Sequence, residues 1–67
     1  MHPSTAAILR HFAYEHLPEH LQEVSRPICE IARRAAASET LAGPELTAGL
    51  RKLLEAKDCL VRAAIDK

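Results

Sequence analysis

The sequence has 67 residues, enough for one domain and too few for two, so residues 1–67 are taken as a single helical domain. Apolar residues make up 48% of it, which argues against a disordered polar tail. Nine basic residues balance nine acidic ones, and this neutrality argues against broad, charge-driven binding to duplex DNA while allowing a compact pocket for a small anion.

The composition also predicts helices and partner subunits. The apolar residues are mainly Ala and Leu, which favour helix, and β-branched residues are few. A domain of this size is marginal alone and usually needs a disulfide, a metal or partner subunits. We expect partner subunits and therefore an all-α homo-oligomer.

Membrane and secretion signals are not found in the sequence. No stretch approaches the ~20 apolar residues of a membrane span. Residues 1–5 (MHPST) lack the basic and apolar regions of a signal peptide. Cys29 and Cys59 lack CxxC spacing, so we expect buried, inert thiols in the reducing cytoplasm and no membrane contact.

The first predicted element is a short helix over residues 6–13, with Ser4 as its N-cap. Its apolar positions recur at helical spacing: Ile8, Leu9, Phe12 and Ala13. The stretch is too short to be stable alone in water, so we expect it to dock on the rest of the chain.

A second helix is predicted to begin at Pro18, because proline disfavours helix in the residue before it and suits a helix's first position. Pro27 lies inside this helix, removes one backbone hydrogen bond, and predicts a kink at residues 24–27. The expected apolar stripe consists of Leu17, Leu21, Val24, Ile28, Ile31 and Ala35.

A third helix is predicted over residues 44–65, after the only segment with linker composition, residues 38–44 (SETLAGP). The short connection makes the second and third helices antiparallel neighbours. Two helices cannot cover both sides of their apolar stripes, so we expect a bundle across subunits. The third helix's expected stripe and its flanks are Leu46, Leu50, Leu53, Lys57, Leu60, Ala64, Leu54, Val61 and Ile65.

Lys57 is the most informative single residue, because it is a cation on an apolar stripe. One interpretation is a stem on apolar surface with its ammonium in water. The other is a cation aimed into an intersubunit cavity, where an anion offsets its desolvation. Asp58 and Arg62 are spaced as a surface ion pair, and so are Arg51 and Glu55.

The only two aromatic residues, Phe12 and Tyr14, precede the break at residues 17–18. Tyr14 either stacks on a nucleobase or pins the short helix, whereas for Phe12 the pinning role is favoured. Arg26, beside Pro27, either binds phosphate or is a solvated charge.

Neither a metal site nor catalysis is predicted. His16 and His20 are separated by Pro18, and no set of four zinc ligands is evident. The chain also lacks a nucleophile elbow and a glycine-rich phosphate loop. We therefore expect a binding protein with no cofactor and no enzymatic activity.

Three segments together resemble the anti-CBASS cyclic-oligonucleotide sponge family of small phage proteins. They are residues 12–18 (FAYEHLP) with Leu21 and Gln22, residues 43–45 (GPE), and residues 53–63 (LLEAKDCLVRA). The resemblance covers nearly the whole chain. This chain has residues 57–59 (KDC) where many members have a more aromatic final helix.

The resemblance implies a helical homohexamer that traps cyclic di- and trinucleotides at subunit interfaces without cleaving them, in the cytoplasm of the host bacterium. Sequestration keeps an antiphage effector from being switched on. Carried over by position, Tyr14 would stack on a base, and Arg26 or Ser25 would contact phosphate. Lys57 would contact phosphate as well, Arg62 would pair with Asp58 or reach the ligand, and Phe12 is a further candidate ligand contact.

Two other functions were weighed from the sequence. A helical adaptor would dock a partner polypeptide through its apolar stripe. A helix-turn-helix DNA binder is disfavoured, because the last helix lacks a clustered basic face.

Overall fold

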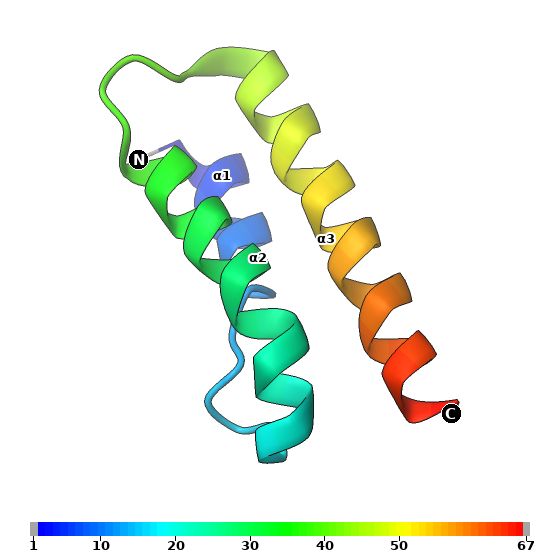
Figure 1. Ribbon diagram of the computed structural model, residues 1–67. Coiled ribbons are helices and arrows are strands. Elements are labelled where there is room, and N and C mark those ends of the chain that lie inside the picture. Colours follow the sequence, from blue (N-terminus) through cyan, green and yellow to red (C-terminus); the bar gives the residue numbers. More distant parts are fainter. Residues whose placement is uncertain (1, 67) are drawn as a thin grey trace.

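Three helices make up the computed structural model, which describes residues 2–66: α1 (Pro3–Leu9), α2 (Glu19–Ala37) and α3 (Gly43–Ile65). Figure 1 shows α2 and α3 as two long helices that run in opposite directions, and α1 contacts both of them. The predicted all-α fold, a short helix followed by a helical hairpin, is confirmed. No helix within residues 2–66 is both long and apolar enough to cross a membrane.

Helix α1 differs from its prediction at both ends. Its N-cap is His2 and not Ser4, because the imidazole Nδ1 of His2 accepts a hydrogen bond of 3.1 Å from the Ser4 backbone N–H. The helix ends at Leu9, four residues before the predicted end. The chain then leaves the helix and places Phe12, which has no exposed surface, in the core.

Helix α2 begins at Glu19, one residue after the predicted start, with Pro18 as its N-cap, and it continues through Pro27 without interruption. Its buried face differs from the expected stripe, because Ile31 is 51% exposed. The buried side chains of α2 are Leu21, Ser25, Cys29 and Ala32. Three of these four are small, so the neighbouring segments pack closely against this face, which a stripe defined by large apolar residues does not predict.

Helix α3 spans the predicted residues and begins one residue earlier, at Gly43. Gly43 has a φ of +82°, a left-handed conformation that glycine adopts without a steric penalty. Leu50 is fully buried, and three other leucines of α3 pack against the core: Leu46, Leu53 and Leu54. Toward its C-terminal end, Leu60 and Ile65 are 50% and 60% exposed.

The hydrophobic core is small and lies where all three helices meet. Its buried members are Ile8, Phe12, Cys29, Ala32 and Leu50. The Ser25 hydroxyl is buried beside this cluster and lies 3.4 Å from the Cys29 sulfur, so it has a hydrogen-bond partner. A core of this size fits the marginal stability expected of so short a chain.

Candidate functional site

Residues 10–17 lead from α1 toward α2, and we call them the connecting segment. Their carbonyl groups cannot join a helix, so side chains from α2 and α3 bind them instead. Lys57 Nζ donates to the His11 carbonyl at 2.8 Å, and Arg33 Nη2 donates to the Phe12 carbonyl at 3.0 Å. Gln22 Nε2 donates to the Leu17 carbonyl at 2.8 Å. Both long helices thereby position this segment.

Tyr14, at the centre of the connecting segment, lies beside two arginines of α2. The guanidinium carbon of Arg26 is 5.7 Å from the centroid of the tyrosine ring, and that of Arg33 is 5.1 Å away. Both distances fall in the range of cation–π attraction. Together with Glu15 these residues form what we call the Tyr14 cluster: Tyr14, Glu15, Arg26 and Arg33.

Glu15 and Arg33 form an ion pair within this cluster. Glu15 Oε1 lies 3.1 Å from Arg33 Nη2, while Oε2 accepts a longer bond of 3.4 Å from the Tyr14 backbone N–H. Its own backbone N–H, and next the Arg33 side chain, lower the pKa of the Glu15 carboxyl from its ordinary value of 4.5. The hydrogen bond to Glu15 raises the pKa of Arg33. Because both side chains are well exposed, the pair contributes little to stability.

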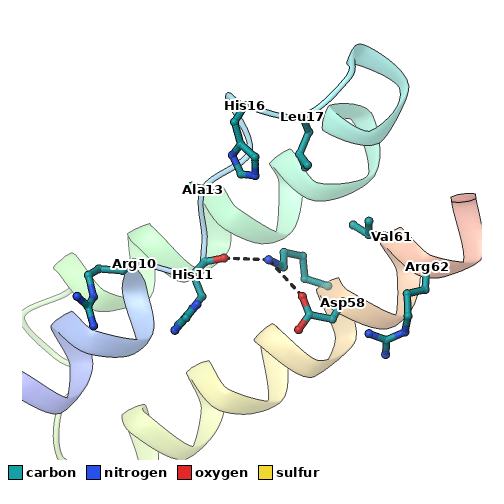
Figure 2. Close-up of a pocket in the computed structure, with 9 residues that line it drawn as sticks. Arg10, His11, Ala13, His16, Leu17, Asp58, Val61 and Arg62 are labelled. Atoms are coloured by element: carbon teal, nitrogen blue, oxygen red, sulfur yellow. Dashed lines mark hydrogen bonds and ion pairs between the residues drawn. The ribbon is translucent and has the colours of Figure 1, made fainter.

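A second candidate region is a cationic pocket of about 390 Å³ between the connecting segment and the C-terminal half of α3 (Figure 2). Its lining residues are Arg10, His11, Ala13, His16, Leu17, Lys57, Asp58, Val61 and Arg62. The Lys57 side chain is only 13% exposed, and its ammonium lies 3.3 Å from Asp58 Oδ1 as well as bonding His11. The two dashed lines in Figure 2 mark these contacts.

The predicted ligand residues are therefore divided between two places. Tyr14 and Arg26 come together in the Tyr14 cluster, and Lys57 and Arg62 line the cationic pocket. The other two, Phe12 and Ser25, have no exposed surface. Phe12 fills the core and the Ser25 hydroxyl lies beside the Cys29 sulfur, so neither side chain reaches the Tyr14 cluster or the cationic pocket in this structure.

Residues near the end of α3 also differ from expectation. Arg62 Nη2 donates to the Cys59 sulfur at 3.4 Å, and Asp58 bonds to Lys57. Among residues 2–66, neither the Asp58–Arg62 nor the Arg51–Glu55 ion pair forms. Cys59 is exposed, so only Cys29 is the buried thiol that was expected. Cys59 faces outward because it lies on the side of α3 away from the core.

Arg33, which contacts both Tyr14 and Glu15, was not predicted from the sequence. One signal for it was present: Arg33 follows Arg26 by seven residues, which is about two helical turns and places both on the same face of α2. Arg10, His11 and His16 of the cationic pocket were missed as well, because they come from the non-helical connecting segment and its edge, where no periodicity applies.

The fold and these two regions define the class of the molecule: a small helical hairpin with an arginine-flanked tyrosine and a separate cationic pocket. Within residues 2–66, no three His, Cys, Asp or Glu side chains come together in a way that could hold a metal ion. No family model, curated protein or solved structure with which the chain was compared matches it.

Proposed function

We propose that this chain is a non-enzymatic binding protein that sequesters cyclic di- and trinucleotide signals and so blocks activation of a CBASS antiphage effector in the bacterial cytoplasm. The observation that supports this most is the Tyr14 cluster, in which two guanidinium groups lie within 6 Å of one aromatic ring. An aromatic face is the group on which bases stack, and guanidinium forks match phosphate oxygens.

The two arginines have different freedom, which suits them to different tasks. Arg33 is held by the Phe12 carbonyl and by Glu15, so it stays in place. Arg26 approaches the ring and makes no hydrogen bond or ion pair within residues 2–66. In the proposed complex Arg26 moves from the ring to a phosphate, and the exposed ring face receives a base.

The cationic pocket is the second place where this proposal puts a phosphate. Arg62, an exposed residue at its wall, reaches the ligand there, and Arg10 lies across from it in Figure 2. Lys57 contributes its positive charge to the pocket while its ammonium holds the His11 carbonyl. Neutral overall charge fits a small enclosed anion better than a long polyanion.

The proposal includes a homo-oligomer, with a hexamer as the form that the resemblance implies. Two shallow hollows that share Ala35 and Leu41 form a largely apolar surface at the α2–α3 connection, and we call it the Leu41 surface. Ile31 and Leu41 are half exposed on it. Covering such side chains with another copy of the chain removes apolar area from water and supplements the small core.

The decisive experiment is calorimetric titration of the protein with a panel of cyclic di- and trinucleotides, after its mass has been measured by light scattering. We expect tight binding with less than one ligand per chain and intact ligand after denaturation. Recovery of cleaved ligand would contradict the non-enzymatic proposal, and no heat with any member of the panel would contradict cyclic-nucleotide binding.

Tyr14→Ala tests the site itself. Loss of base stacking, worth about 1–3 kcal/mol per base, should weaken binding of the preferred cyclic dinucleotide roughly 5- to 150-fold. Tyr14→Phe is the matched control, because it keeps the ring and removes only the hydroxyl, and it should bind nearly as well as the unchanged protein. If folded Tyr14→Ala protein binds undiminished, Tyr14 does not stack on the ligand.

A second candidate function is that of an adaptor that docks a different polypeptide on the Leu41 surface. The exposure of Ile31 and Leu41 favours it, because an amphipathic partner helix could cover the same side chains. This candidate predicts a chain that binds a host or phage polypeptide and gives no heat with nucleotides. The titration described above therefore separates the two functions.

A further inference from the structure

The Tyr14 cluster contains a carboxylate where a phosphate-binding site would be expected to hold only cations. Glu15 is fixed from two sides, by Arg33 at 3.1 Å and by the Tyr14 backbone N–H at 3.4 Å. Its negative charge is therefore held beside the Tyr14 backbone and the anchored arginine. A ligand that stacks on Tyr14 and accepts hydrogen bonds from Arg33 through a phosphate must place that phosphate near Glu15.

Arg33 still has donors available in this arrangement. Both of its hydrogen bonds within residues 2–66, to Phe12 and to Glu15, come from Nη2. A guanidinium carries five N–H donors in a rigid fork. The Nη1 and Nε sides can therefore bind one phosphate while Glu15 remains paired, and the carboxylate acts on the ligand as a fixed nearby charge.

We propose that Glu15 is a charge filter, which lets the Tyr14 cluster accept phosphodiesters and disfavours terminal phosphate monoesters. This inference rests on the proposed function. A phosphodiester carries one negative charge, whereas a terminal phosphate carries nearly two at pH 7, because its second pKa is about 6. Repulsion by a fixed carboxylate rises in proportion to the ligand's charge, so Glu15 offsets more of the attraction that Arg26 and Arg33 exert on the monoester than of their attraction for the diester.

The consequence is a preference for ring-closed ligands. A cyclic dinucleotide contains only phosphodiesters, whereas its ring-opened form ends in a phosphate monoester. The lowered pKa of the Glu15 carboxyl keeps it ionised throughout the neutral range, so the filter operates at cellular pH. A sponge with this filter retains intact signals and binds their hydrolysed forms less tightly than it would without Glu15.

The test compares each cyclic dinucleotide with its own linear form. The probes are cyclic di-AMP, cyclic di-GMP and 3′,3′-cyclic GMP–AMP, each paired with the corresponding linear 5′-phosphorylated dinucleotide. Glu15→Gln removes the charge and keeps the side-chain size. For one extra unit of charge a few ångströms from the carboxylate in a solvated site, we expect the cyclic-over-linear ratio of affinities to fall roughly three- to tenfold in this variant, mainly through tighter binding of the linear form.

Glu39→Gln is the matched control, because it makes the same change of net charge on an exposed residue of the α2–α3 connection, and it should leave the ratio unchanged. A pH series on the unchanged protein and on Glu15→Gln gives a second readout. Between pH 7 and pH 5.2 the terminal phosphate gains a proton while Glu15 stays ionised, so the difference between the cyclic-over-linear ratios of the two proteins should shrink.

Two results would overturn the inference while leaving the proposed function in place. One is a ratio that Glu15→Gln does not change, with cyclic ligand still bound tightly. The other is an equal loss of both ligands, which would make Glu15 a positioning residue for Tyr14. Failure of the unchanged protein to bind any cyclic probe would overturn the proposed function and the filter with it.

Discussion

Lys57 shows how the surroundings of one side chain decide its role. The sequence left two interpretations, a stem with its ammonium in water or a cation aimed into a cavity between subunits. The side chain is mostly buried, and its ammonium bonds the His11 carbonyl at 2.8 Å, across 46 residues of sequence. Lys57 therefore ties α3 to the connecting segment, and its charge reaches the cationic pocket from a fixed position.

Lys57→Met is the corresponding prediction at the residue scale. Methionine keeps the apolar stem and removes the charged donor, so the His11 carbonyl loses its partner. We expect the free energy of unfolding to fall by about 1–2 kcal/mol, measured by urea denaturation. Lys52→Met, on an exposed position of the same helix, should change it by less than about 0.5 kcal/mol. Equal effects of the two variants would show that the contact between Lys57 and the His11 carbonyl contributes nothing to the free energy of unfolding.

Helix α3 contains two glycines in opposite backbone situations. Gly43 has a φ of +82° at the start of the helix, and Gly49 lies in the helix interior. A β-carbon added at either position would meet nothing within 4 Å, so backbone conformation alone decides the effect of a substitution. Alanine substitutions at these two positions therefore test the effect of backbone conformation without a change in side-chain packing.

Gly43→Ala should lower the free energy of unfolding by about 1–2 kcal/mol, because alanine in the left-handed region is strained. Gly49→Ala should raise it by about 0.5–1 kcal/mol, because glycine in a helix loses more chain entropy on folding than alanine. Thermal unfolding followed by circular dichroism measures both. Shifts of the same sign would contradict the left-handed conformation of Gly43.

Helix α2 continues through Pro27 even though proline supplies no N–H to the preceding turn. Pro27→Ala restores a donor for the carbonyl of Glu23, so we expect the free energy of unfolding to rise by about 1–2 kcal/mol. Pro44→Ala is the control at the first turn of α3, where proline is favourable, and it should give no gain. A loss with Pro27→Ala would show that the local helix shape at proline is needed to bury Ser25 and Cys29.

At the scale of the whole molecule, a small core coexists with half-exposed apolar side chains. Leu41 lies in both hollows of the Leu41 surface, and the proposed oligomer covers it. Leu41→Glu should therefore shift the mass measured by light scattering toward that of a single chain, because burying an unpaired carboxylate is costly. Ala7→Glu adds the same charge to an exposed position of α1 and should leave the mass unchanged. Retention of the oligomer by Leu41→Glu would exclude this surface as the interface.

The helices were predictable because their signals are local. Pro18 precedes α2 and the Gly43–Pro44 pair begins α3, and each acts through its own backbone geometry. The end of α1 was not predictable from periodicity, because Phe12 continues the helical spacing yet enters the core from the non-helical connecting segment. The buried face of α2 differs from the expected stripe for a similar reason. The stripe was defined by large apolar residues, whereas the buried side chains of α2 include the small residues Ser25, Cys29 and Ala32.

The candidate site was predictable in part. Tyr14 and Arg26 were singled out together, and the structure brings them within 6 Å. Ser25, one residue from Arg26, points into the core, because a shift of one residue turns a helical side chain by about 100°. The contributions of Arg33 and Glu15 were not visible, since a charged residue on a helix surface has no sequence signature for the group it meets.

By itself, then, the sequence determined the helical class of this protein, the extents of α2 and α3 and the antiparallel hairpin, because helix propensity, proline and short connections act over a few residues. Only the tertiary structure decided which faces are buried, that Lys57 binds the His11 carbonyl, and that Arg33 meets Tyr14 and Glu15. These contacts join positions 46, 19 and 18 residues apart, and they depend on how closely three packed segments approach one another. No local pattern encodes that distance.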